Sequence, residues 1–198
     1  MFIYLINPIV LLLLHFYYYK NKNHPSEKYI WVFVIFLLTI FIGLRYEIGA
    51  DWITYQSYFN TIENIKIKEN ILKSSAVYLL INKIVYNGGF EFWGVNILCA
   101  SIFMLSLGFF LQNSQNKWLG LLFSFPIIIV ILGMGYVRQG LAFSFILLLI
   151  KSLENKNLLN VSVFIILSIV SHKSALFICA LLLFINFIYY KNTLLIII

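Results

Sequence analysis

Four scarce polar side chains could do chemistry in this sequence. Asp51 is the only aspartate in 198 residues, and Arg45 and Arg138 are the only arginines. An arginine guanidinium is a planar fork that matches phosphate oxygens, while a carboxylate can accept a proton or bind a sugar hydroxyl. The ordinary pKa of a histidine lies near neutrality, so His172 could donate a proton or a hydrogen bond to a leaving phosphate. These residue types suit a site that binds a phosphate group and moves a proton.

The segment LRYEIGADWITY, residues 44–55, begins where an apolar run ends. Gly49 could form a backbone turn that is closed to other residues. Arg45 could keep Asp51 ionised, as a base or as a ligand for a sugar hydroxyl. Two simpler interpretations stay open, since Arg45 could be a snorkelling anchor among lipid headgroups and Asp51 could be the N-cap of the next helix.

Arg138 lies at the predicted start of another helix, just after Gly133, Gly135 and Tyr136. A cation is unfavourable there because the helix dipole is positive at its N-terminus, which indicates an anionic partner. The guanidinium and the free N–H groups of the first helical turn would together make a strong phosphate site. Gln139, the next residue, could bind a sugar hydroxyl. The alternative for Arg138 is again a snorkelling anchor.

The remaining candidates flank these residues. Lys173 could face water or the same anion, and His172 could instead be an interfacial residue without chemistry. A set of aromatic residues follows Asp51 at near-helical spacing, as an interfacial belt or as a sugar-stacking platform: Trp52, Tyr55, Tyr58 and Phe59. We expect no metal and no cofactor, because Cys99 and Cys179 lie in separate apolar runs and the arginines can supply positive charge.

The composition indicates which elements must position these side chains. Hydrophobic residues make up 62% of the chain and charged residues only 11%, and the mean hydropathy is +0.94. Soluble domains carry about 25% charged residues, so we expect an integral membrane protein. Apolar runs long enough for helical spans occur near 2–19, 29–44, 92–112, 118–135, 138–150, 158–171 and 174–190. The sequence therefore predicts an all-α polytopic fold, one membrane domain with about seven spans.

The long connection at 45–91 contains two short amphipathic pieces, WITYQSYFN and AVYLLINKIVY, that could lie on the membrane surface or dip into it. The lysines of the short connections all fall on one side: Lys20, Lys22, Lys28, Lys117, Lys151, Lys156 and Lys191. Lysine-rich short loops mark the cytoplasm. The amino terminus and all four scarce polar residues are therefore expected on the extracytoplasmic side. The final NTLLIII predicts an eighth helix that is cut off, so we expect an amino-terminal fragment of a longer protein.

Some classes of protein lose support. The net charge of +7 comes largely from loop lysines and suits orientation in a bilayer better than nucleic-acid binding. The sequence has no GxSxG, Walker A, GxGxxG or HExxH pattern. An intramembrane serine protease, a nucleotide-driven pump and a zinc protease are therefore disfavoured.

Three segments resemble a known family in order and spacing. LRYEIGADWITYQSYF resembles the R-x-x-[I/V]-G-x-D-[Y/W]-x-x-Y signature of the EpsG-type family of bacterial exopolysaccharide polymerases, which are related in role to the Wzy O-antigen and capsule polymerases. VRQGLA resembles the family's R-Q-x-[L/I]-A segment, and SHKSAL its H-x-[S/T]-[A/S] segment. The resemblance implies a multi-pass enzyme of the bacterial inner membrane. Such an enzyme transfers a glycan from an undecaprenyl-diphosphate carrier onto the non-reducing end of another lipid-linked repeat unit, on the extracytoplasmic face.

The resemblance also implies roles for residues. Arg45 and Arg138 would hold the diphosphate, Asp51 would be the base or an acceptor-sugar ligand, and His172 a second phosphate contact or an acid. Beside these roles, we expect substrate contacts from Gly49, Trp52, Tyr55, Gln139 and Lys173. The implied partners are the lipid bilayer, the undecaprenyl-diphosphate-linked oligosaccharide and other polysaccharide-assembly proteins. The alternatives are a flippase for lipid-linked oligosaccharides and an inactive remnant or partner in a polysaccharide-assembly complex.

Overall fold

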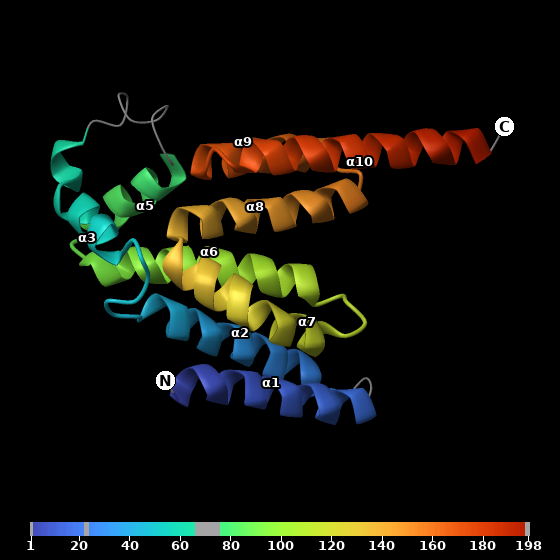
Figure 1. The fold of residues 1–198 in the computed structure, drawn as a ribbon, viewed down its shortest axis with the longest axis horizontal. Helices are drawn as coiled ribbons and strands as arrows, with labels where there is room; N and C mark the ends of the chain where they lie inside the picture. Colours follow the sequence, from blue (N-terminus) through green and yellow to red (C-terminus); the bar gives the residue numbers. More distant parts are fainter. Residues whose placement is uncertain (1, 22–23, 66–75, 197–198) are drawn as a thin grey trace.

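A computed structural model describes residues 2–21, 24–65 and 76–196, and these ranges contain helices and no strand. The all-α prediction is confirmed for them. The long helical segments run alternately in opposite directions (Figure 1): α1 (Phe2–Lys20), α2 (Glu27–Gly43), α6 (Phe92–Leu111), α7 (Lys117–Ser124) with its continuation η2 (Phe125–Gly135), α8 (Val137–Glu154), α9 (Leu158–Ser171) and α10 (Ala175–Ile196). Each predicted apolar run is thus helical.

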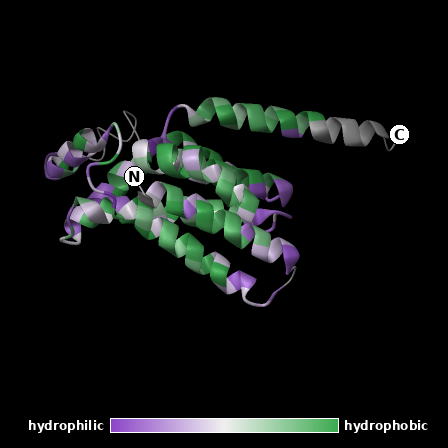
Figure 2. Cartoon of the chain, turned by 60° about the horizontal axis from the view of Figure 1, so that its bottom comes forward, coloured by the Kyte–Doolittle hydropathy of each residue, from purple (hydrophilic) through white to green (hydrophobic). Residues whose placement is uncertain are grey.

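The described helices carry the surface of a membrane protein. Figure 2 shows hydrophobic residues along most of the helices and hydrophilic residues near their ends. Large apolar side chains face outward, and Leu105 and Phe123 are 64% and 72% exposed. Water does not favour an exterior of this kind, whereas lipid does. Among the described residues, two helices are long and apolar enough to cross a membrane, Phe92–Leu111 and Lys117–Gly135. Shorter apolar helices occupy Leu158–Ser171 and Ala175–Ile188. The number of spans stays a prediction.

Two details differ from the sequence-based expectation. The fourth run is α-helical only to Ser124 and continues as the π-helix η2. Pro126 explains the change, because proline has no N–H to donate and its ring crowds the carbonyl group four residues earlier, which disfavours α-helical geometry there. The prediction of an eighth helix is wrong for the described residues. The segment up to Ile196 continues α10 because no proline or glycine interrupts it, and residues 197–198 lie outside the described ranges.

The two amphipathic pieces of the long connection are helices that cover one end of the bundle. They form α3 (Trp52–Asn60) and α5 (Ala76–Asn87), with a short 3₁₀ turn at Ile62–Asn64. Aromatic and aliphatic side chains of both helices pack with α6 and the start of α8, in a core that includes Trp52, Tyr55, Tyr78, Val95 and Leu141. Because this core buries their apolar sides, α3 and α5 pack those sides against the rest of the protein and not into lipid.

Connections at the two ends of the bundle differ in character. The end capped by α3 and α5, called here the α3–α5 end, also receives residues 44–51, 88–91, 135–137 and 172–174 (Figure 1). The opposite end holds the turns between α1 and α2, α6 and α7, and α8 and α9, with the described lysines Lys20, Lys28, Lys117, Lys151 and Lys156. The expected separation of the four scarce residues from these lysines is therefore present. Which end faces the cytoplasm stays a prediction.

Candidate functional site

Helix α3 presents two neighbouring stripes of side chains at the α3–α5 end. Because a helix repeats every 3.6 residues, Asp51, Tyr55 and Tyr58 lie along one stripe. Trp52, Gln56 and Phe59 lie along the next, about 100° around the helix. The first stripe faces Arg138, and the second faces the side of Arg45.

Arg138 lies among three tyrosine rings. Its guanidinium carbon is 5.2 Å from the ring centroid of Tyr55, 5.5 Å from that of Tyr58 and 5.4 Å from that of Tyr78. The prediction that α8 starts here is confirmed, since its first residue is Val137. Each cation–π contact stabilises the cation by about 0.5–2 kcal/mol. The rings thus hold Arg138 at the helix N-terminus, where the dipole opposes it. Because the guanidinium packs among these rings, the snorkelling alternative for Arg138 is wrong.

Asp51 stands at the N-cap position of α3, but its carboxylate makes no capping hydrogen bond. The hydroxyl of Tyr55 donates instead to Asp51 Oδ2 over 3.4 Å. Burial, with a smaller effect of Asp51, raises the pKa of Tyr55 against the opposing effect of Arg138. The phenol therefore stays protonated and keeps its donor. Asp51 thus occupies the predicted N-cap position without capping α3 through its side chain, and Tyr55 links the carboxylate to the guanidinium.

His172 ends α9 and lies within electrostatic reach of Arg138. Burial, and then the positive charge of Arg138, lower the pKa of His172. The backbone N–H of Ser174 donates to His172 Nδ1 over 3.3 Å, and the Ser174 hydroxyl lies 2.7 Å from the same atom. Because Nδ1 accepts, the proton of the neutral ring is assigned to Nε2. His172 is therefore suited to donate a hydrogen bond from Nε2.

Arg45 does not snorkel. Its side chain is only 6% exposed, Nη1 donates to the Ile42 carbonyl over 2.9 Å, and Nη2 donates to Asn96 Oδ1 over 3.0 Å. Its guanidinium carbon also lies 5.8 Å from the ring centroid of Trp52. A headgroup anchor would point outward, so this alternative is wrong because Asn96 on α6 offers a buried acceptor.

Gly49 forms the predicted turn between Arg45 and α3. Its φ of +111° is a conformation that side-chain-bearing residues rarely adopt. A Cβ placed on it would lie 2.7 Å from the Met134 carbonyl oxygen and 3.1 Å from Gly135 Cα. The turn therefore packs directly on the end of η2, just before α8. This close approach sets Asp51 relative to Arg138.

The other predicted site residues divide between two positions. Trp52 is buried on the Arg45 side and packs edge-on against Phe92, with ring centroids 5.1 Å apart. An interfacial belt is thus wrong for Trp52, and the same holds for Tyr55 and Phe59, which are also buried. Gln139 and Lys173 are exposed at the α3–α5 end. Within the described ranges, no hydrogen bond or ring contact joins either of these two side chains to Arg138.

Two residues of the site were not predicted. Tyr78 on α5 completes the rings around Arg138, and Asn96 on α6 holds Arg45. Asn96 had a usable signal, since an amide inside an apolar span is costly without a partner. Tyr78 had none, because its partner lies sixty residues further on. Among the described residues, no group of three or more His, Cys, Asp or Glu side chains is placed to hold a metal ion.

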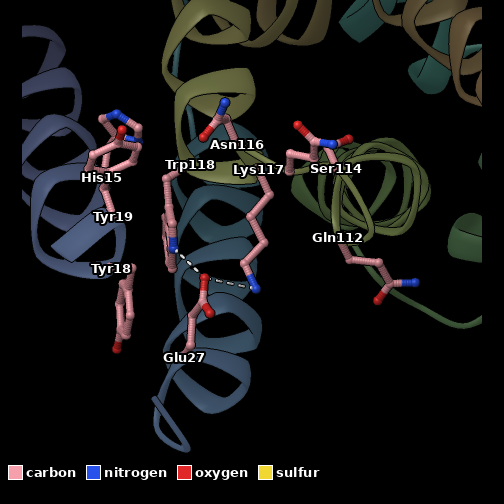
Figure 3. Close-up of a pocket in the computed structure, with 10 residues that line it drawn as sticks. His15, Tyr18, Tyr19, Glu27, Gln112, Ser114, Asn116, Lys117 and Trp118 are labelled. Carbon is pink, nitrogen blue, oxygen red and sulfur yellow. Dashed lines mark hydrogen bonds and ion pairs between the residues drawn. The ribbon is translucent and has the colours of Figure 1, made fainter. Parts of the chain in front are cut away.

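A pocket of about 520 Å³ lies at the end of the bundle opposite the α3–α5 end (Figure 3). Its charged side chains, Glu27 and Lys117, pair with each other. Glu27 Oε1 accepts from Trp118 Nε1 over 3.0 Å and lies 3.1 Å from Lys117 Nζ. The Tyr18 ring stacks on Trp118, with centroids 5.5 Å apart. These contacts join α1, α2 and α7. We call Tyr18, Glu27, Lys117 and Trp118 the clamp, because their contacts hold the three helices together. Variants of the clamp can serve as controls for variants at the α3–α5 end.

The comparisons with known proteins give one match. The model of the EpsG family matches residues 28–198, which is most of the chain and includes every candidate site residue. No curated protein and no solved structure matches.

Proposed function

Because the chain belongs to the EpsG family, we propose that it lengthens a polysaccharide by transferring a glycan from an undecaprenyl-diphosphate carrier to the non-reducing end of another lipid-linked repeat unit. The coarser statement follows from the family alone: this is a membrane protein with a function of the polysaccharide-polymerase type. The carrier, the direction of transfer and the residue roles below are the proposal.

The observation that carries the proposal is the position of Arg138 among the tyrosine rings of α3 and α5, with Tyr55 hydrogen-bonded to Asp51. His172 lies close enough for the charge of Arg138 to lower its pKa. In such a transfer the diphosphate is the leaving group, and catalysis requires stabilising its growing negative charge. Arg138 and the first-turn N–H groups of α8 would supply that stabilisation. His172 would add one hydrogen bond from Nε2–H. A neutral ring favours the phosphate-contact role over that of an acid.

Asp51 supplies the other half of the step. The acceptor sugar hydroxyl attacks the anomeric carbon of the donor glycan, and a new carbon–oxygen bond forms. The bond between that carbon and the diphosphate oxygen breaks, and the electron pair leaves with the diphosphate. The hydroxyl proton passes to the Asp51 carboxylate, which the Tyr55 hydroxyl orients through its hydrogen bond. No nucleotide sugar is required, and no metal is demanded because arginine can supply the positive charge.

The placement in the cell is part of the same proposal. The lysine-rich end would face the cytoplasm, which puts the α3–α5 end on the extracytoplasmic face of a bacterial inner membrane. Other polysaccharide-assembly proteins would supply and remove the lipid-linked chains. A flippase is less well supported, because transport favours polar groups near the midplane of several spans, whereas the candidate residues gather at one end.

The test is reconstitution of the full chain in liposomes with an undecaprenyl-diphosphate-linked oligosaccharide. We expect longer lipid-linked glycans to form. One molecule of undecaprenyl diphosphate should be released for each glycosidic bond formed. Movement of the unit across the bilayer without lengthening would instead support a flippase.

A matched pair of histidines gives the control for this test. His24 and His172 have the same local geometry, because each Nδ1 accepts from the N–H of a serine two residues on, over 3.3 Å. His24 lies at the opposite end of the bundle. His172→Ala should slow lengthening about tenfold or more, as expected for a lost hydrogen bond to a charged group. His24→Ala should leave the rate unchanged, and equal effects of the two would contradict the role of His172.

A further inference from the structure

A pocket of about 530 Å³ opens at the α3–α5 end, on the Arg45 side of α3. This is within the range of small-molecule sites, roughly 300–1,000 Å³. Helix α3 contributes Trp52, Gln56 and Asn60 to its wall. The start of α6 contributes Glu91 and Trp93, from the other side. Different segments thus bring aromatic and polar groups to one hollow.

Three polar side chains of this pocket have no hydrogen-bonding or ionic partner among the described residues. They are Gln56, Asn60 and Glu91, and all three side chains are exposed. An amide both donates and accepts, and a carboxylate accepts. Neighbouring sugar hydroxyls, each of which donates and accepts, match such a set. The clamp at the opposite end differs, because Glu27 there is already paired with Lys117.

The aromatic groups complete the match to a sugar. Trp93 is 45% exposed and meets Phe90 edge-on, with centroids 5.9 Å apart, so its ring is held in place while part of it stays accessible. The apolar C–H face of a pyranose ring packs on such a surface, as apolar ligand faces do in other pockets. Around Arg138 the guanidinium contacts three tyrosine rings, whereas the Arg45 guanidinium contacts Trp52. No cation–π contact among the described residues involves Trp93. A sugar therefore fits the Arg45 side better.

Arg45 forms a fixed part of the pocket wall. Its two terminal nitrogens are anchored on Ile42 and Asn96, which fixes the plane of the guanidinium. Its Nε is buried and has no hydrogen-bond partner among the described residues. A buried donor without an acceptor is unfavourable. Arg138 Nε is also buried without a partner among the described residues, so Arg45 is assigned to this pocket by its place in the wall and not by its unpaired donor.

We propose that this pocket is the subsite for the acceptor sugar, the residue whose hydroxyl loses its proton to Asp51. The inference rests on the proposed function. Each stripe of α3 begins at the start of the helix, where Asp51 and Trp52 are consecutive. A sugar on the Trp52 side is therefore adjacent to the base, while the diphosphate lies on the Arg138 side. Arg45 then contacts the acceptor sugar, and Arg138 alone of the two arginines contacts the diphosphate.

Tryptophan fluorescence tests this subsite. Two of the four tryptophans, Trp52 and Trp93, line the pocket, while Trp31 and Trp118 contact each other at the opposite end. The full chain in detergent micelles is titrated with the methyl glycosides of glucose, galactose, N-acetylglucosamine, N-acetylgalactosamine and glucuronic acid. We expect a saturable change with at least one of them. Gln56→Ala and Asn60→Ala should each weaken that binding about tenfold, and Glu27→Gln should leave it unchanged.

The outcomes separate this inference from the proposed function. Arg138→Lys should abolish lengthening of the glycan and leave glycoside binding intact. Glycoside binding with no lengthening under any condition would keep the subsite and overturn the polymerase. The subsite is overturned if no glycoside gives a saturable change. It is also overturned if the two α3 variants bind as tightly as the wild type while lengthening still depends on Arg138.

Discussion

Replacing Gly49 by alanine perturbs the contact that positions the site. The new Cβ would lie 2.7 Å from the Met134 carbonyl oxygen, a backbone atom that cannot rotate away, and the residue would keep a φ of +111°. Backbone strain of this kind costs about 1–3 kcal/mol. Overpacking costs about 1–3 kcal/mol as well. The 44–51 turn should therefore shift away from η2, and Asp51 should move with it.

Gly89 provides the matched control for this change. Its φ is also positive, at +74°, but a Cβ there would meet nothing within 4 Å. Gly89→Ala should thus cost only the backbone strain, about 1–2 kcal/mol. We expect Gly49→Ala to lower the midpoint of thermal unfolding in micelles by at least twice as much, and to reduce glycan lengthening more than tenfold. If the two variants unfold at the same temperature, the close packing of Gly49 on η2 is refuted.

Three further perturbations follow from the described contacts. Asn96→Leu removes the acceptor of a buried guanidinium and should destabilise the fold by about 2–3 kcal/mol, measured by thermal unfolding; a neutral effect would mean that Arg45 does not depend on Asn96. Tyr78→Phe keeps the ring beside Arg138 and should preserve lengthening, whereas Tyr78→Leu should reduce it, and equal rates would refute the ring contact. Because burial and Arg138 lower the pKa of His172, protonation of this ring opposes folding. Its contribution to stability is then present above the ordinary pKa, about 6.5, and is lost as the pH falls below it. His172→Gln should flatten that part of the profile of unfolding temperature against pH, and an unchanged profile would contradict the shift.

The fold was largely predictable because composition and run length determine which segments form apolar helices. No partner residue has to be known for that prediction. The π-helix was harder, although Pro126 marked the place where α-helical hydrogen bonding is interrupted. The continuation of α10 to Ile196 was not predicted. Lys191 follows the apolar run 174–190 and yet lies inside the helix, so the final NTLLIII extends α10 and does not begin a new helix.

For the candidate site, the sequence indicated which residues to consider but not how they contact one another, and the roles of these residues stay predictions. Scarce charge identified Arg45, Asp51 and Arg138, because polar groups are costly near lipid and need a reason to be there. Their contacts depend on segments far away in the chain. Asn96 is fifty-one residues from Arg45, and Tyr78 is sixty residues from Arg138, so no local pattern links them. The division of the site by α3 follows from these long-range contacts.

The most direct test of the account is the glycan product of Arg138→Lys in a strain whose own polymerase gene is deleted. Lysine keeps the charge but loses the planar fork that binds phosphate oxygens and lies beside the tyrosine rings. With the wild-type chain, we expect a ladder of long lipid-linked glycans. With Arg138→Lys at the same protein level, we expect single repeat units to accumulate on the carrier and the ladder to disappear. A normal ladder from this variant would contradict the central claim that Arg138 stabilises the leaving diphosphate.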